Sequence, residues 1–121
     1  MVQVTVHTSA ATLQAHRAAL SDAIQDALVA ALDHPPQKRF QRFVGLAPED
    51  FIHPPELGDQ YTIVEISMFA GRTGEQKRTL IRELQQRIEA ATGIPARCVE
   101  ITVFETPRSS WGIRGMNGAE L

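Results

Sequence analysis

The sequence predicts an α/β fold in which a four-stranded mixed sheet carries two helices on one face. The first observation is an internal repeat, because residues 1–60 align with residues 61–121 without a gap when they are shifted by sixty positions. The second is that each half holds an alternating apolar run followed by a helical apolar stripe. We therefore expect one domain, residues 1–121, built from two β-α-β repeats. The coinciding positions are mostly apolar: Val4 with Val64, Leu20 with Leu80, Ile24 with Leu84, and Leu28 with Ile88.

The first repeat begins with a strand over residues 2–8, where valines alternate with polar residues in the pattern of a sheet with one buried face. Over residues 12–33 leucine and isoleucine recur mostly four positions apart, which predicts an amphipathic helix. Pro35 ends this helix, since proline disfavours a helical residue before it. A strand over residues 39–44 should pair with the first strand in parallel, and the proline-rich residues 45–60 join the repeats.

The second repeat shows the same order of elements. A strand is expected over residues 61–69, and Thr73 can cap a helix because Gln76 stands three residues later, at capping-box spacing. Gly93 lies where a left-handed helix end is favoured, and the valines and isoleucine of residues 99–103 alternate as a last strand.

Composition excludes several classes of function. Twelve basic and fourteen acidic side chains give a net charge of −2, so no polybasic field attracts a nucleic acid, and no apolar run is long enough for a membrane. The single cysteine, Cys98, cannot form an internal disulfide, and no Cys or His cluster has metal-ligand spacing. The N-terminus lacks the features of a signal peptide. We expect a cytoplasmic protein with no metal and no cofactor.

Chemistry-bearing residues gather after the third strand and in the glycine-rich tail, residues 107–121. The segments are Gly71-Arg72-Thr73-Gly74-Glu75-Gln76-Lys77 and Trp111-Gly112-Ile113-Arg114-Gly115. Together they closely resemble the 4-oxalocrotonate tautomerase family, whose corresponding segments have the same separation. Because the chain holds two units joined through Phe51-Ile52-His53-Pro54, it is similar to the longer members of the tautomerase superfamily that include malonate semialdehyde decarboxylase.

This resemblance implies a tautomerase-like fold assembled as a homotrimer around a central sheet barrel. It also implies a cofactor-independent isomerase, in which an N-terminal proline moves a proton and arginines such as Arg72 hold a small carboxylate substrate. The chemistry is reasonable because a free α-amino group has an ordinary pKa of roughly 7.7 to 8.0, close to neutral pH.

Three positions depart from the family pattern. Val2 stands where the proline is expected, Lys38 where the longer relatives have an aspartate, and Ala70 where they have a second arginine. The terminal amine of Met1, or of Val2 after removal of the methionine, is then the available base. Replacement of the aspartate by lysine disfavours a decarboxylase or hydratase mechanism, whereas Lys38 and Arg39 together with Arg72 could form an anion site.

The sequence therefore predicts a slow or atypical keto-enol tautomerase acting on a 2-oxo acid or a related small carboxylate. Met1, Val2 and Arg72 are the expected catalytic residues. The expected substrate-binding residues are Lys38, Arg39 and Trp111, with the tryptophan walling the pocket. A surface or subunit salt bridge is the alternative role for Arg72, and an aromatic trimer contact is the alternative for Trp111.

Two rival functions follow from the same residues. One is a non-catalytic trimeric binding or scaffold protein that kept the fold and lost the base, because a fold does not guarantee an activity. The other is an enzyme that uses a different base, such as His7 or Lys38.

Overall fold

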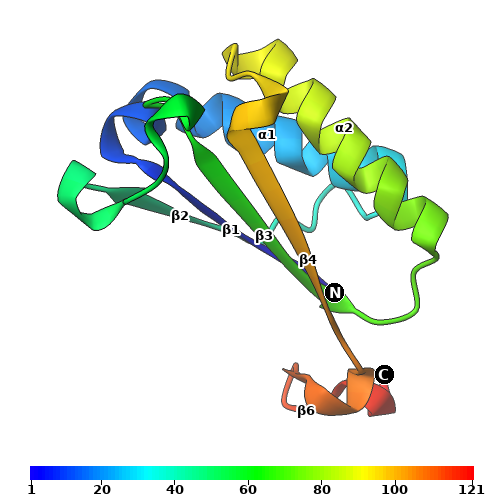
Figure 1. Cartoon of the computed structure of the whole chain (residues 1–121). Helices are drawn as coiled ribbons and strands as arrows, with labels where there is room; N and C mark the ends of the chain where they lie inside the picture. The colour runs from blue at the N-terminus through cyan, green and yellow to red at the C-terminus, as the bar shows by residue number, and fades with distance from the viewer.

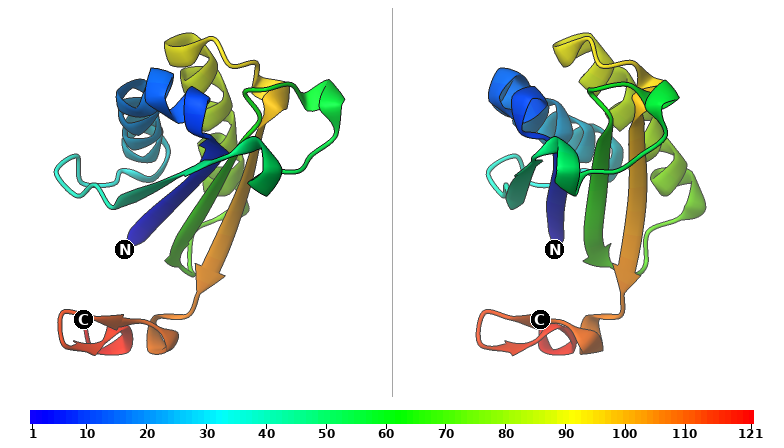
Figure 2. Two further views of the ribbon diagram at one scale, coloured as in Figure 1. Left: turned by 90° about the vertical axis from the view of Figure 1, so that its left-hand side faces the viewer. Right: turned by 60° about the vertical axis from the view of Figure 1, so that its left-hand side comes forward.

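The computed structural model describes residues 1–121, and it forms one four-stranded sheet with two helices on the same face (Figures 1 and 2). The main elements are β1 (Val2–Ser9), α1 (Ala10–Leu32), β2 (Gln41–Leu46), β3 (Thr62–Phe69), α2 (Gly74–Thr92) and β4 (Val99–Thr106). The strand order is β2-β1-β3-β4, with β1 parallel to β2, β3 parallel to β4, and β1 antiparallel to β3. The predicted mixed sheet with two helices on one face is confirmed.

The core lies between the sheet and the two helices. Alternate residues of β1 and β3 point toward the helices, as the period of two requires, and the helical stripes of α1 and α2 face them. The central side chains are almost completely shielded from solvent: Val4, Val6, Leu20, Ile24, Leu28, Val64, Ile66, Leu80, Leu84 and Ile88. Burial of this apolar surface is the main force that holds the two repeats together.

Strand register places three chain segments at one end of the sheet, where strands begin or end. Val2 lies opposite Met68 in the antiparallel pair, and Phe69 lies opposite Thr106 in the parallel pair. The beginning of β1 therefore meets the ends of β3 and β4. Figure 1 shows the N-terminus beside this end of the sheet.

The two helices begin differently. The hydroxyl oxygen of Ser9 accepts a hydrogen bond from the Thr12 amide, so α1 follows β1 directly and starts two residues before the predicted residue 12. In contrast, α2 starts at Gly74 after a loop in which Gly71 has a φ of 124°, a conformation that favours glycine. The predicted capping box of Thr73 and Gln76 is confirmed, and so is the left-handed helix end at Gly93.

The connections are partly structured. Strand β2 begins at Gln41, two residues later than predicted, and the joint between the repeats contains two short 3-10 helices, Pro48–Asp50 and Pro55–Leu57. The tail forms a small hairpin of β5 (Gly112–Ile113) and β6 (Met116–Asn117). Figures 1 and 2 show the tail projecting beyond the end of β4.

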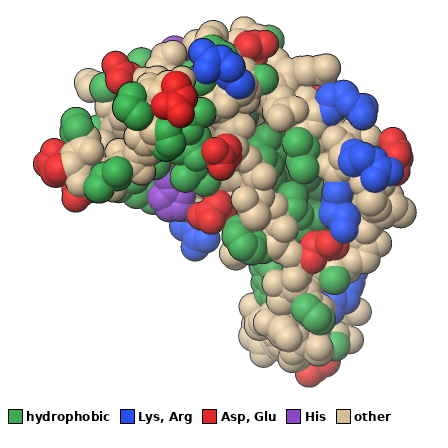
Figure 3. All heavy atoms as spheres, in the orientation of Figure 1, with side chains coloured by type: hydrophobic (Ala, Val, Ile, Leu, Met, Phe, Trp, Pro, Cys, Tyr) green, Lys and Arg blue, Asp and Glu red, His purple; other side chains and the backbone are tan.

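The surface carries both signs of charge. Figure 3 shows acidic and basic side chains interspersed on the face seen in Figure 1, without a continuous basic patch. Neither long helix is apolar enough over its length to cross a membrane.

Replacing Thr73 by Ala should lower the free energy of unfolding by about 1 kcal/mol, because the amide of Gln76 loses its side-chain acceptor. Denaturant unfolding at one fixed protein concentration measures the change. Thr79→Ala, inside the same helix, is the matched control and should not destabilise the protein, since alanine favours a helix interior. Equal midpoints for both variants would show that the cap contributes nothing.

Candidate functional site

A hollow of about 330 Å³ lies at the end of the sheet where β1 begins and β3 ends. Strand pairing and the loop before α2 bring its residues together from both repeats. The lining side chains that matter for chemistry are Met1, Phe69, Arg72, Gln76 and Arg108. All three predicted catalytic residues, Met1, Val2 and Arg72, therefore line one hollow.

The amine of Met1 is held at this end of the sheet by the strand. The backbone amide of Phe69 donates a hydrogen bond to the Met1 carbonyl oxygen over 3.3 Å, which extends the β1–β3 pairing by one residue. Partial burial lowers the pKa of the amine below its ordinary 8.0, and the positive charges of Arg108 and Arg72 lower it further, followed by those of Lys38 and Arg114. A larger share of this amine is therefore uncharged at neutral pH than in a free chain end.

Arg72 is anchored by one of its nitrogens. Its Nη1 donates a hydrogen bond to the carbonyl oxygen of Leu32 over 2.9 Å. That oxygen belongs to the last turn of α1, where carbonyls lack partners within the helix. Because a guanidinium has five N–H donors, the anchor leaves donors for an anion in the hollow.

Aromatic rings and a second arginine form the outer wall. Arg108 lies over the ring of Phe69, with its Cζ 4.8 Å from the ring centroid. Trp111 meets the same ring edge-on, with centroids 5.1 Å apart and an interplanar angle of 78°. Within this chain Trp111 thus supports Phe69, which lines the hollow, rather than lining it directly.

Lys38 and Arg39, which were predicted to bind the substrate together, have different surroundings. The charge of Lys38 acts on the Met1 amine, whereas Arg39 binds the Asp22 carboxylate over 2.7 Å and the Ser21 hydroxyl over 3.0 Å. Within this chain Arg39 therefore does not line the hollow with Arg72, and its role in substrate binding stays a prediction. The reason is local: α1 presents an acidic partner to Arg39, and the chain turns away along β2.

His34 is a residue that sequence reasoning missed. Its side chain is buried, with 6% exposed, and its Nε2 lies 2.6 Å from the carbonyl oxygen of Lys38. Because a carbonyl only accepts, Nε2 carries the proton and Nδ1 keeps a lone pair in the neutral ring. Burial lowers the pKa of His34 despite this hydrogen bond, and the charges of the Met1 amine, Arg72 and Lys38 lower it further.

Arg108 was also not predicted as a site residue, although its position after the last strand of the sheet indicates where it lies. It stands two residues after the end of β4. Because the ends of parallel strands lie at the same end of a sheet, β4 brings Arg108 beside the loop after β3. His7, the alternative base, lies elsewhere, on the open sheet face 3.5 Å from the Glu65 carboxylate. No three His, Cys, Asp or Glu side chains are grouped so that they could hold a metal ion.

Comparisons with known proteins agree with this architecture. A protein-family model described as tautomerase enzyme matches residues 38–114. A 2-hydroxymuconate tautomerase of Pseudomonas putida is 39% identical over 57 residues, which cover 47% of this chain and 90% of that enzyme.

Solved structures match nearly the whole chain. A fused 4-OT wild-type symmetric trimer has a TM-score of 0.83 and 27% identity, covering 98% of this chain and 96% of the other. FG41 malonate semialdehyde decarboxylase inhibited by 3-bromopropiolate has a TM-score of 0.73 and 29% identity, covering 92% and 88%.

The buried His34 should make stability depend on pH. Its pKa is lowered in the folded chain, so the unfolded chain binds the extra proton as pH falls through about 6.5. The stabilisation is complete above that pH and decreases below it, by at most about 1.4 kcal/mol per pH unit. His34→Gln should remove this dependence in denaturant unfolding measured between about pH 5 and about pH 7.

His16→Gln, on the surface of α1, is the matched control and should keep the pH dependence of the parent chain. If His34→Gln and the parent lose stability equally on acidification, the buried imidazole is not the titrating group.

Proposed function

The chain belongs to the tautomerase family, and we propose that it is an atypical keto-enol tautomerase that isomerises a small 2-oxo acid at the hollow beside Met1. One observation carries the proposal: an amine whose pKa is lowered shares a hollow with two arginines. This arrangement supplies both a proton carrier and a binding site for a carboxylate. Val2 stands in the position of the family's proline, so the base is a primary amine.

In the proposed reaction the carboxylate of the substrate binds the free N–H donors of Arg72 and the guanidinium of Arg108. The neutral amine accepts the proton of the enol hydroxyl, and the resulting ammonium protonates the substrate carbon to give the ketone. One O–H bond breaks and one C–H bond forms, so the reaction needs no oxidant or cofactor. The same positive charges stabilise the enolate that develops between these two transfers.

The cations also set the balance between binding and basicity. Each positive charge near the amine favours its neutral form, which is the form that accepts a proton. Once the substrate carboxylate binds, it offsets part of that charge and allows the amine to hold the proton it has taken. Lys38 acts in this scheme through its charge on the amine, and Arg39 has no role in it.

We also propose that the chain assembles as a homotrimer, as the fused 4-OT neighbour does. The sheet face opposite the helices is polar and open, with side chains such as Gln3, Thr5 and Glu65 only half-buried. The tail, which holds Arg114 and the exposed Met116, projects from the sheet, and its main contacts are within the tail itself. Contact with neighbouring subunits would cover both surfaces.

A second candidate is a non-catalytic trimeric binding protein. The observation that favours it is the residue at position 2, whose side chain is 3% exposed and packed in the core, so it supplies strand packing where the family has its proline. In that case the hollow would bind a carboxylate without turning it over.

Replacing Arg72 by Ala should lower kcat/KM for ketonisation of phenylenolpyruvate about 10- to 100-fold, because a hydrogen bond to a charged group contributes roughly 1.5 to 3 kcal/mol. Ultraviolet absorbance of the enol measures the rate. Arg78→Ala is the matched control: its guanidinium is exposed on α2 and pairs with Glu75, outside the hollow.

A further variant separates the two candidates. Val2→Pro, verified by intact mass to have lost Met1, restores a terminal secondary amine. An active parent that loses turnover with Arg72→Ala supports the tautomerase. An inactive parent that gains turnover with Val2→Pro indicates a binding protein with an intact pocket. Inactivity of all variants contradicts the proposed tautomerase.

The pH profile tests the base directly. Below its pKa the amine is protonated and cannot accept a proton, so kcat/KM should rise with pH and level off, with a midpoint below 8.0. Arg108→Ala removes the strongest nearby charge and should move the midpoint to higher pH. A profile that stays unchanged in Arg108→Ala would exclude the Met1 amine as the titrating base.

A further inference from the structure

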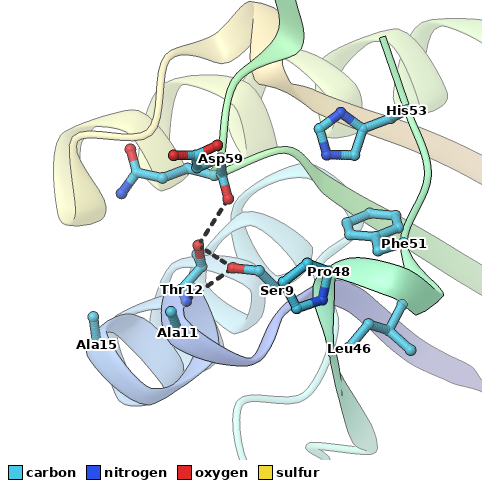
Figure 4. A pocket seen from close by; sticks show the side chains of 10 residues that line it. Ser9, Ala11, Thr12, Ala15, Leu46, Pro48, Phe51, His53 and Asp59 are labelled. Atoms are coloured by element: carbon cyan, nitrogen blue, oxygen red, sulfur yellow. Dashed lines mark hydrogen bonds between the residues drawn. The ribbon is translucent and has the colours of Figure 1, made fainter. Parts of the chain in front are cut away.

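A second hollow, of about 560 Å³, lies at the opposite end of the sheet. It is surrounded by the end of β1, the start of α1 and the joint that precedes β3. Figure 4 shows side chains from these segments surrounding it, with Ser9 and Thr12 on one side and Phe51 and His53 on the other. Asp59 closes the side nearest to Thr12. None of the residues of the proposed tautomerase site contributes to this hollow.

The internal repeat relates the two hollows. A shift of sixty positions places Ser9, the last residue of β1, on Phe69, the last residue of β3. The same shift pairs other residues of the two sites: Thr12 with Arg72, Pro48 with Arg108, and Phe51 with Trp111. The larger hollow is thus the counterpart, in the first repeat, of the hollow beside Met1.

The second hollow differs from the first in the charge of its lining residues. Both arginines are replaced by uncharged residues, and no Lys or Arg lines the second hollow. The counterpart of Met1 is Tyr61, whose nitrogen is part of a peptide bond and cannot act as an amine base. The joint, residues 45–60, holds four acidic side chains and no Lys or Arg: Glu49, Asp50, Glu56 and Asp59. Asp59 is the acidic residue that lines the hollow. A carboxylate would be repelled here, whereas a cation would be attracted.

Aromatic rings form one wall of the second hollow. Phe51 stacks on Tyr61 with centroids 5.5 Å apart and an interplanar angle of 23°. His53 packs against both rings, 5.1 Å from Phe51 and 4.9 Å from Tyr61. Three rings that support one another form a stable apolar surface, suited to stacking with another ring.

The lining residues also offer hydrogen-bond acceptors. The Thr12 hydroxyl donates to the Asp59 carbonyl oxygen over 3.4 Å, which places Asp59 at the rim. The Asp59 carboxylate makes no hydrogen bond or ion pair within the chain. His53 Nδ1 lies 3.1 Å from the Pro54 carbonyl oxygen, so Nδ1 carries the proton in that contact and Nε2 is left as an acceptor.

We propose that this hollow is a second binding site, which takes a small aromatic amine through ring stacking on Phe51 and an ionic hydrogen bond to Asp59. The site is separate from the proposed tautomerase reaction and does not rest on it. Its ligand differs in charge from the carboxylate suited to Arg72, because the counterparts of Arg72 and Arg108 are uncharged and Asp59 lines this hollow.

The test uses three probes with the same ring and different charge: benzylamine, benzyl alcohol and benzoate. Each is titrated into the full-length protein, and backbone amide signals are followed by NMR. Benzylamine should shift the signals of Thr12, Ala15 and Phe51 with saturation in the millimolar range expected of a fragment. Benzyl alcohol should bind more weakly, and benzoate should leave these signals unchanged.

Two variants locate the binding. Ala15 lines the hollow with an exposed side chain, so Ala15→Phe should fill it and abolish the benzylamine shifts. Ala30→Phe, also at an exposed position of α1 but about 22 Å along the helix, is the matched control and should bind like the parent. Asp59→Asn should weaken benzylamine by about 1.4- to 5-fold, as loss of an exposed ion pair predicts, and should not weaken benzyl alcohol.

Equal binding of benzoate and benzylamine, or benzylamine binding that persists in Ala15→Phe, would overturn the proposal. So would an absence of saturable shifts at Thr12 and Phe51. Turnover of phenylenolpyruvate by Ala15→Phe should equal that of the parent. Failure of the tautomerase assay and failure of benzylamine binding are therefore independent results.

Discussion

Antiparallel pairing of β1 with β3 is the interaction on which the site depends. It joins the two repeats through the centre of the sheet, and its register sets Val2 opposite Met68. The start of the chain is thereby held beside the loop that carries Arg72, although seventy positions of sequence separate them. A slip of one residue would turn the valines of β1 away from the helices, so burial of these side chains also fixes where the Met1 amine lies.

Helix α1 contributes to the site beside Met1 through its last turn. Its carbonyl at Leu32 anchors Arg72, and the segment that follows brings His34 and Lys38 near the Met1 amine. The positive charges of the site therefore come from three separate connections, after α1, after β3 and after β4. Partial removal from water strengthens their effect on the amine, because the ammonium form loses hydration while the cations remain near it.

Divergence between the repeats explains how a duplicated fold can hold two different hollows. The loop before α2 has Gly71 in a conformation that suits glycine, which frees Arg72 from the helix, whereas α1 begins directly at Ala10 and includes Thr12. The first repeat thus has a buried hydroxyl where the second has a half-buried guanidinium. The acidic joint and its aromatic cluster complete the difference in charge between the two ends of the sheet.

The amino-acid sequence was enough to predict the order of elements, the capping box of α2 and the family, because apolar periodicity and short motifs are local properties. It also identified Met1, Val2 and Arg72, while the division into repeats at residue 60, the roles of these residues and a cytoplasmic location stay predictions. The arrival of Arg108 and His34 near Met1, and the pairing of Arg39 with Asp22, became visible in the folded chain alone. Strand register and helix packing bring distant residues together, and neither can be read from a single segment of sequence.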